Sequence, residues 1–531
     1  MGVRLPATGL RLRGPGLRRV LALGLILAVA AACGTRRDAG TARLRLAWSA
    51  DPVSLDPAKA VDVVGGSAVS LLYEGLVDFA PDGSLVPGVA ARWRAEEGGR
   101  VWRFSLDPSA QDSEGRPIGA TEVTASLRRL LAPSTASPRG WVLERVRGAR
   151  DFAAGSADSL AGLRVQDGDV VFELERPSPS FPEMLAMPNA AILPAGGDVS
   201  GKVSTGPWVL VEHVRDSHLL LRRNPHWHGA RPAYDEIQVR ILPEDFTRVA
   251  EYEVGNLDVL EIPAAESARF RSDPHLSPHV LRQVSLAVEY IGLDGDDPVL
   301  RDPRVRRALN EAVDVDLLLE RVLGGRGVRS AGAIPPGLPG GGKGQPFAHD
   351  PAAARRLLAQ CKIPPGWQLE LWQRPSPLAS QVLEAVQSDL AAVGVKAVLR
   401  VRDWSALKAS IDRGETPAFF ANWYADYPDA ENFLVPLFHS KNIGGGGNRA
   451  RFRDGAIDAA LDSLESDPDP SARAARCADI DRRVHDEAPW IYLWHPVSEV
   501  AVSDRVAGVV TSAVPASERW LTARPVAGRK P

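Results

Sequence analysis

The sequence predicts a mixed α/β fold. Strand-like alternation of apolar and polar residues recurs along the chain, and helix-start signals become strong after about residue 300. Strand and helix patterns then alternate between about residues 290 and 490, which favours a parallel-type β/α unit there. The preceding part has more strand and turn signals, so we expect the two halves to differ in architecture.

Four strands are predicted in the first half. In residues 43–48, Leu44, Leu46 and Trp48 lie on one face, while Arg43 and Arg45 lie on the other. This alternation is typical of a half-buried strand. Similar patterns predict strands at residues 101–106, 170–174 and 235–242.

Helices dominate the second half. Asp302 and Pro303 supply an N-cap and a proline at the first helical position. The apolar residues that follow are spaced as on a buried helix face. Comparable signals predict helices after Asp316, after Asp350, over 376–394, and from Asp403 to Gly414, with strands at 395–402 and 419–423.

The N-terminus is typical of a secretory signal. Residues 1–32 contain five arginines and no acidic residue, and residues 20–32 are an unbroken aliphatic and small-residue stretch. This stretch is too short to span a bilayer, which needs about 20 residues. We therefore interpret residues 1–32 as a signal peptide.

Cys33 follows directly, and Ala30 to Cys33 resembles the lipobox of bacterial lipoproteins, although that family prefers a larger aliphatic residue than Ala30. The resemblance implies that Cys33 carries a lipid and that residues 33–42 form a polar tether. The alternative is an ordinary signal peptide with a chance cysteine. The lipoprotein interpretation predicts an exported chain, lipid-anchored to the cell membrane and facing the periplasm or the cell exterior.

Composition excludes several classes of protein. The formal net charge is −3 and becomes −8 without residues 1–32, which argues against nucleic-acid binding. An apolar share of 44% with 24% charged residues is ordinary for a globular protein. Three cysteines exclude a disulfide scaffold. Cys361 and Cys477 either pair with each other or are two buried thiols.

Common catalytic and metal-binding signatures are missing. The sequence has no G-x-S-x-G, H-E-x-x-H or Walker A motif. Its histidine pairs, His226/His228 and His275/His279, lack further ligands at suitable spacing. We therefore predict no catalytic residues, no metal site and no cofactor, and favour a protein that is not an enzyme.

Several short segments, in order along residues 43–500, resemble one family. They resemble the bacterial extracellular solute-binding proteins of the oligopeptide and dipeptide uptake systems (family 5), which serve ATP-binding-cassette (ABC) importers. The most specific segment is residues 423–438, W-Y-A-D-Y-P-D-A-E-N-F-L-V-P-L-F, although the family often has proline in place of Ala430. The others are S-L-D-P at 54–57, Y-E-G-L-V at 73–77, T-G-P-W at 205–208, R-N-P at 223–225, G-N-L-D at 255–258, Y-I-G-L at 290–293 and D-P-R-V-R-R-A-L-N at 302–310.

The resemblance implies a two-lobed, periplasmic-binding-protein-like fold with a hinge and an additional inserted domain. Ligand is expected between the lobes, which close by hinge bending. The implied domain boundaries are 43–72, 196–286 and 491–531 for lobe I, 73–195 for the inserted domain, and 287–490 for lobe II.

The resemblance also implies a peptide site. Every peptide with a free N-terminus carries an ammonium group, which a carboxylate can hold. Asp426 matches the family's amine-binding aspartate by its place in W-x-x-D-Y. The alternative role for Asp426 is to cap a turn before Pro428.

Neighbouring residues are also interpreted from this match. Trp423 and Tyr424 either line the cleft or pack in the core, whereas Asp429, Glu431 and Asn432 are interpreted as turn and capping residues. Residues 61–67 occupy the stretch that approaches the ligand in relatives, but they carry no characteristic motif here.

The expected function is capture of short peptides and delivery to ABC permease subunits with cytoplasmic ATPases. The chain is expected to contact the membrane through its N-terminal lipid, to act as a monomer and to bind no nucleic acid. One alternative keeps the receptor role with a non-peptide ligand, such as a nickel complex, haem, a sugar or an opine. Another is an exported hydrolase or a structural lipoprotein.

Overall fold

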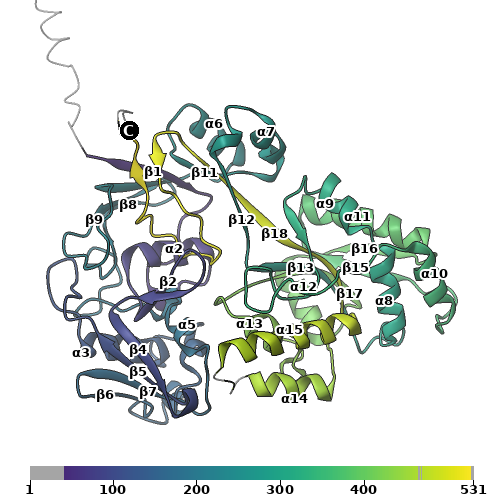
Figure 1. The fold of residues 1–531 in the computed structure, drawn as a ribbon, viewed down its shortest axis with the longest axis horizontal. Coiled ribbons are helices and arrows are strands. Elements are labelled where there is room, and N and C mark those ends of the chain that lie inside the picture. The colour runs from purple at the N-terminus through teal and green to yellow at the C-terminus, as the bar shows by residue number, and fades with distance from the viewer. Residues whose placement is uncertain (1–40, 465–466, 468, 528–531) are drawn as a thin grey trace, which may run out of the picture. The chain divides into compact units, whose positions relative to one another are not determined.

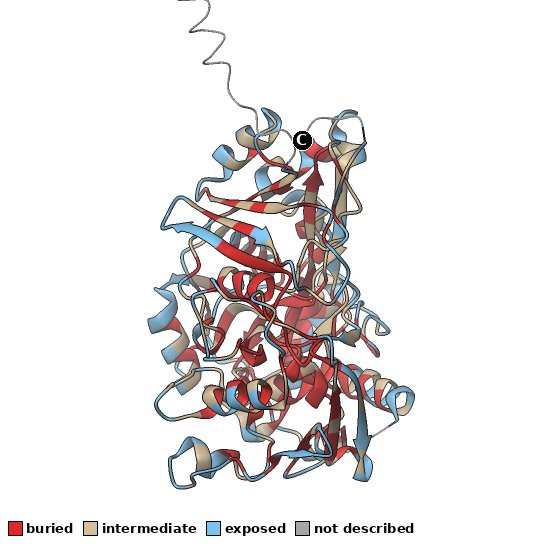
Figure 2. Ribbon diagram, turned by 90° about the vertical axis from the view of Figure 1, so that its left-hand side faces the viewer, coloured by how far each residue is buried: buried red, intermediate tan, exposed pale blue. Residues whose placement is uncertain are grey.

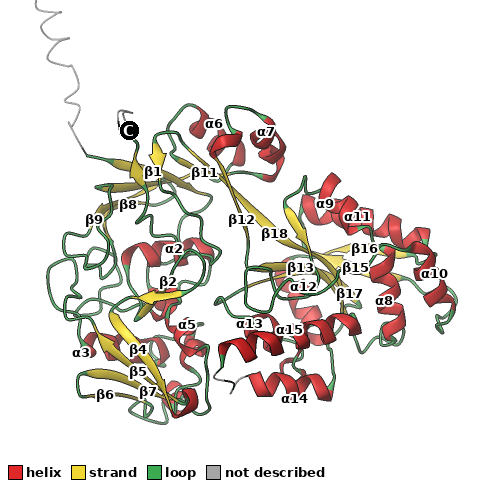
Figure 3. Ribbon diagram, in the orientation of Figure 1, coloured by secondary structure: helices red, strands yellow, loops and turns green. Residues whose placement is uncertain are grey.

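The computed structural model describes residues 41–464, 467 and 469–527. The predicted signal peptide, Cys33 and the tether up to residue 40 lie outside the described residues. From residue 43 onward, helices and strands are mixed along the chain, and buried residues concentrate on the strands and on the inner faces of the helices (Figures 1, 2 and 3).

The first sheet unites segments far apart in the sequence. Strand β1 (Arg43–Trp48) pairs in parallel with β10 (Glu236–Ile241), and β9 (His218–Arg223) joins β10 to β8 (Trp208–Val214) through antiparallel pairs. The strands predicted at 43–48 and 235–242 are therefore confirmed. Their alternating apolar residues are buried except Trp48, which is partly exposed, as expected for strands that cover a core with one face.

A second sheet of four antiparallel strands follows. It has the order β4-β5-β7-β6 and confirms the strands predicted at 101–106 and 170–174. Helix α3 (Ala120–Leu131) packs on it through Val123, Leu127 and Leu130, in a core formed largely by residues 76–192. The strands are β4 (Ala90–Glu96), β5 (Val101–Leu106), β6 (Leu163–Gln166) and β7 (Asp169–Glu173).

The largest sheet in the described part of the chain has eight strands and mixed direction. Strand β15 pairs in parallel with both β16 and β17, whereas β13 is antiparallel to β17 and to β18. Its strands are β11 (Val259–Glu261), β12 (Val280–Val284), β13 (Ala287–Leu293), β14 (Gly327–Arg329), β15 (Leu369–Gln373), β16 (Ala397–Val401), β17 (Ala418–Tyr424) and β18 (Trp490–Val502).

The predicted parallel unit is therefore confirmed only for β15, β16 and β17. It is wrong for β13 and β18, because an apolar pattern identifies a strand but does not fix its direction or its neighbours. Two short hairpin-like pairs complete the described strands: β2 (Val77–Phe79) with β3 (Leu85–Pro87), and β19 (Val506–Ala507) with β20 (Arg524–Pro525).

Strand β18 connects two groups of strands. Its first half pairs with β13 and β14, and its second half pairs with β11 and β12 (Figure 1). Glu499 in the second half is fully buried and lies 2.9 Å from Arg282 Nε on β12. Ser267 Oγ donates to the other Glu499 oxygen at 2.5 Å. These contacts compensate a buried charge on the strand that both groups share.

The helix starts follow the sequence signals closely. Asp302, Asp350, Ser376 and Asp403 each cap a helix with the side chain, as expected for such residues. The helix predicted after Asp316 begins at Val315 and is capped by Asp314 instead. These helices are α8 (Pro303–Ala312), α9 (Val315–Arg321), α10 (Pro351–Ala359), α11 (Pro377–Ala392) and α12 (Trp404–Arg413).

The remaining described α-helices are α2 (Val63–Leu72), α4 (Ala149–Ala153), α5 (Phe181–Leu185), α6 (Asp245–Glu253), α7 (Ser267–Ser272), α13 (Glu431–Phe438), α14 (Gly455–Leu464) and α15 (Pro470–Glu487). Within the described ranges, no helix combines the length and apolar character that crossing a bilayer requires.

The two described cysteines are free thiols, so the pairing alternative is wrong. Cys477 is buried on α15, in the core that α13 and α14 share. Cys361 is only partly buried and packs at the edge of a different core, which contains α8 and α11. Separate cores hold the two sulfur atoms, and only the folded chain reveals this.

Candidate functional site

Asp426 lies just beyond β17, where the chain turns toward α13. Its backbone N–H donates to Asn432 Oδ1 at 3.0 Å, and Trp423 Nε1 donates to the same oxygen at 3.2 Å. Asn432 is buried on the first turn of α13. One buried amide oxygen therefore fixes the end of the strand and the start of the helix, and the interpretation of Asn432 as only a turn or capping residue is too narrow.

The two aromatic residues before Asp426 differ in environment. Successive strand residues point to opposite faces, so Trp423 and Tyr424 at the end of β17 do not share a face. Trp423 is partly buried against the core of α13 and α15. Tyr424 is 50% exposed, which leaves much of its ring available for contact. The structure thus groups Trp423 with Asp426 and leaves Tyr424 outside this hydrogen-bonded group.

Arg139 is the cation that faces Asp426. Its Nη1 lies 3.4 Å from Asp426 Oδ1, and its Nη2 donates to the Val61 carbonyl oxygen at 2.9 Å. Arg139 and Asp426 are 287 positions apart in the chain. Sequence reasoning missed Arg139 because no motif surrounds it and only the tertiary fold brings the two residues together.

The segment that presents the Val61 carbonyl is held from several sides. Asp56, from the S-L-D-P motif, caps the short helix Pro57–Lys59 and binds Arg129 through both carboxylate oxygens, at 2.8 and 2.6 Å. Asn189 Nδ2 donates to two further backbone carbonyls of this segment, each at 2.8 Å. The motif aspartate therefore positions the backbone beside Asp426.

The electrostatic environment of Asp426 has two opposing contributions. Burial raises the pKa of the Asp426 carboxyl above its usual range, and the Arg139 guanidinium only partly offsets this effect. A carboxylate in such surroundings gains from a further cation or hydrogen-bond donor, because its own solvation is incomplete. The arrangement is thus suited to hold a positively charged ligand group.

A small cavity adjoins Asp426. It has a volume of about 20 Å³, enough for one water-sized group. Its lining includes Ser70 at the buried side of α2, together with Asp78 and Arg519, which form an ion pair at 2.6 Å. Burial raises the pKa of Asp78 to about 7 despite Arg519. Polar groups from three separate segments therefore converge near Asp426.

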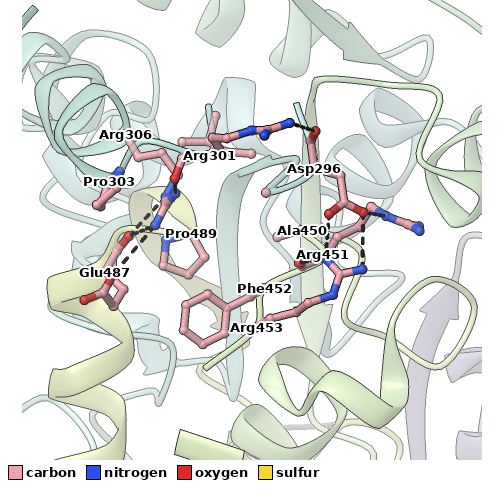
Figure 4. Close-up of a pocket in the computed structure, with 12 residues that line it drawn as sticks. Asp296, Arg301, Pro303, Arg306, Ala450, Arg451, Phe452, Arg453, Glu487 and Pro489 are labelled. Carbon is pink, nitrogen blue, oxygen red and sulfur yellow. Dashed lines mark hydrogen bonds and ion pairs between the residues drawn. The ribbon is translucent and has the colours of Figure 1, made fainter. Parts of the chain in front are cut away.

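A larger cavity of about 430 Å³ lies elsewhere, beside α8 and the end of α15 (Figure 4). Figure 4 shows Asp296 beside Arg451 and Arg453. Arg451 Nε donates to Asp296 Oδ2 at 2.7 Å, and Arg453 Nη1 donates to Asp296 Oδ1 at 2.6 Å. Arg306 in the same cavity donates to the backbone carbonyls of Glu487 and Leu300. Asp296 is held by two short contacts, whereas Asp426 has one contact of 3.4 Å, so this cavity is a weaker ligand-site candidate than the surroundings of Asp426.

A buried ion network lies next to Asp426. Glu431 accepts from Arg145 at 2.6 Å, from Ser180 at 2.9 Å and from Arg473 at 3.0 Å, while Arg473 also binds Asp429. Burial favours the protonated form of Glu431, but the two arginines outweigh it and lower its pKa. The interpretation of Glu431 as a capping residue is wrong, because its carboxylate links three distant segments.

The described residues contain no group of three or more histidine, cysteine, aspartate or glutamate side chains placed to hold a metal ion. His228, from one of the two histidine pairs, instead contacts Glu74 at 2.7 Å. The groups around Asp426 that could receive a ligand are carboxylate and backbone carbonyl oxygens and aromatic rings. These oxygens accept hydrogen bonds, so they suit an organic ligand that donates them.

The family of the chain follows from sequence comparison. Residues 84–445 match the bacterial extracellular solute-binding proteins, family 5. This match covers more than half of the 531 residues. The chain therefore belongs to the family 5 solute-binding proteins, and the family resemblance is confirmed.

Named relatives cover nearly the whole chain. A probable di/tripeptide-binding protein 5 of Pseudomonas aeruginosa is 28% identical over 89% of this chain and 94% of its own length. Heme-binding protein A of Haemophilus influenzae is also 28% identical, over 87% of this chain and 88% of its own.

A solved structure is similar in fold. The unliganded open form of the periplasmic murein tripeptide-binding protein MppA has a TM-score of 0.79 and 25% identity, covering 92% of this chain and 99% of that one. This likeness confirms the predicted two-lobed α/β fold.

We predict that Glu431→Ala lowers the free energy of unfolding by about 3–5 kcal/mol, because two arginines lose a shared buried anion. Urea unfolding followed by tryptophan fluorescence measures the change. Since the folded-state pKa of Glu431 is lowered, the difference is present in full above about pH 4.3 and is lost at lower pH.

The matched control is Glu415→Ala, which removes a carboxylate that pairs with Arg413 at the surface and is 52% exposed. The control should leave the urea midpoint almost unchanged, because an exposed ion pair contributes little to stability. Equal losses in the two variants contradict the structural role of the buried network.

Proposed function

We propose that the chain is the extracytoplasmic substrate-binding component of an ABC importer and captures short peptides for delivery to membrane permease subunits with cytoplasmic ATPases. Family membership and the peptide-binding relatives support the receptor role. The observation that carries the choice of ligand is the partly buried Asp426 carboxylate beside the Val61 carbonyl. Together they offer two acceptors to a terminal ammonium group.

Each site residue has a specific proposed role. Asp426 compensates the charge of the peptide's terminal ammonium, and the Val61 carbonyl accepts one of its N–H groups. Tyr424 contacts the peptide through its exposed ring, while Trp423 supports Asp426 through Asn432. Backbone groups read the constant part of a peptide, so the site accepts varied side chains.

The proposed domain organisation is lobe I at 43–72, 196–286 and 491–531, the inserted domain at 73–195, and lobe II at 287–490. Strand β18 supports it, because its two halves pair with different strands. One crossing between the proposed lobes lies within β18, between these two halves. The other crossing lies between β12 and β13, at residues 284–287. Bending at these two crossings would open and close the ligand site.

Ligand identity tests the proposal directly. The chain starting after Cys33 is purified, denatured gently and analysed for released small molecules by mass spectrometry. We expect a series of short peptides, each of which raises the melting temperature of the ligand-stripped protein. A single haem, nickel complex, sugar or opine contradicts the peptide ligand, and peptide hydrolysis by the purified chain contradicts the receptor role.

Asp426→Asn is expected to weaken binding of trialanine by about 2–5 kcal/mol, because it leaves the peptide's ammonium group without its carboxylate partner in the closed cleft. Isothermal titration calorimetry measures the change, with Glu415→Gln as a surface control. Unchanged affinity contradicts the amine-binding role.

The same site predicts a pH dependence. Only ionised Asp426 compensates the ammonium charge, and burial raises its pKa in the folded protein. Wild-type affinity should therefore fall on acidification, with a midpoint above the ordinary aspartate pKa of about 4. Asp426→Asn should lose this dependence, and an unchanged pH profile in the variant assigns the titration to another group.

We further propose that the chain acts as an exported monomer, anchored to the membrane by a lipid on Cys33 and facing the periplasm or the cell exterior. The basic and apolar pattern of residues 1–32 and the small residues before Cys33 support this proposal. A single acyl chain gives only marginal membrane affinity, so stable anchoring needs the multiple chains that lipoproteins carry.

Cys33→Ser should move the exported protein from the membrane fraction to the soluble fraction. Cell fractionation and mass spectrometry of the mature N-terminus measure the change, with Cys361→Ser as the control, because Cys361 lies on the folded body. Membrane retention of the Cys33→Ser chain contradicts lipid anchoring.

A further inference from the structure

Arg139 occupies both acceptors that the proposed function assigns to a ligand's ammonium group. Its guanidinium reaches the Asp426 carboxylate through one nitrogen and the Val61 carbonyl through the other. The protein thus already places a cation where the peptide's cation is expected.

The contact between Arg139 and Asp426 is weak for an arginine–carboxylate pair. One contact of 3.4 Å joins Arg139 Nη1 to Asp426 Oδ1, and the two side chains are 25% and 31% exposed. Strong charge-assisted hydrogen bonds are about 2.7–2.9 Å long. In the same region, Arg129 binds Asp56 through two contacts of 2.8 and 2.6 Å. The fold therefore makes a strong arginine pair nearby and leaves the Arg139 pair loose.

The backbone of Arg139 is anchored independently of its guanidinium. Arg139 N–H donates to Ser137 Oγ at 3.1 Å, and Ser137 Oγ donates to the Ala58 carbonyl at 2.6 Å. The flexible arginine side chain can consequently leave Asp426 by rotation while the loop and the Val61 segment remain in place.

We propose that Arg139 is a specificity-determining residue that holds the place of the ligand's ammonium on Asp426 and Val61, so that a peptide binds by displacing the guanidinium. The proposal rests on the proposed function. Exchange of one cation for another keeps the Asp426 charge compensated throughout, which avoids the cost of an unpaired, partly buried carboxylate. A ligand without a cationic end leaves Arg139 on Asp426 and gains nothing from that carboxylate, so Arg139 reduces the advantage that a free amine would otherwise have over such a ligand.

The competition has a direct consequence for affinity. A free amine must break the contact between Arg139 and Asp426 before it binds. Arg139 therefore lowers the apparent affinity for the amine by the free energy of that contact. Partly exposed ion pairs of this kind are weak, which corresponds to a change in affinity of about threefold to fivefold. An N-acetylated peptide does not compete for the carboxylate, so its affinity is not limited in this way.

The test compares trialanine with N-acetyl-trialanine on wild type and Arg139→Gln. Calorimetry gives the ratio of the two dissociation constants for each protein. We expect Arg139→Gln to increase the preference for the free amine by about threefold to fivefold. Arg139→Lys, which retains the cation, should stay nearer to wild type.

The charge-matched control is Arg150→Gln. Arg150 lies in the same region of the chain, is 84% exposed and pairs with Glu144. It should leave the ratio unchanged, which separates local competition from a general loss of positive charge. Melting curves confirm that each variant is folded.

The measurements distinguish a failure of the proposed exchange from a failure of the proposed function. If wild type binds neither peptide, the proposed function is contradicted and the exchange with it. If wild type binds trialanine but Arg139→Gln leaves the ratio unchanged, only the exchange is contradicted. If Arg139→Gln weakens both peptides equally, Arg139 holds the ligand itself and does not compete with it.

Discussion

A carboxylate removed from water must be matched by a cation, a hydrogen-bond donor or a proton, and this constraint organises the molecule. Glu431 meets it with Arg145 and Arg473, and Glu499 with Arg282 and Ser267. Asp481 on α15 meets it differently: it accepts from two backbone N–H groups, and burial raises its pKa to about 7. Each solution ties together segments distant in sequence.

The strength of these charge pairs distinguishes the framework positions from the proposed ligand position. Asp56 and Glu431 are held by short contacts with arginines, which suits residues that fix the framework. Asp426 has one long contact and remains partly exposed. The same chemistry therefore fixes the framework where the contacts are short and numerous, and the loose pair is where we propose that a ligand exchanges with Arg139.

Local signals predicted much of the second half of the fold. Aspartate or serine before a helix start, as at Asp302 or Ser376, places the cap within one turn of the chain, so sequence is sufficient there. Strand direction was harder to predict from the sequence. The apolar pattern of β13 is the same whether its neighbours run parallel or antiparallel, and pairing with β17 and β18 is decided over more than a hundred residues.

The sequence alone determined the family, the α/β class, most helix starts in the second half and Asp426 as the candidate site residue. These depend on residue order and local periodicity. Only the tertiary structure decided that Arg139 faces Asp426, that Glu431 is a buried anion and that Cys361 and Cys477 lie in separate cores. Such contacts arise from long-range chain packing, and no local pattern encodes which distant side chain will supply the compensating charge.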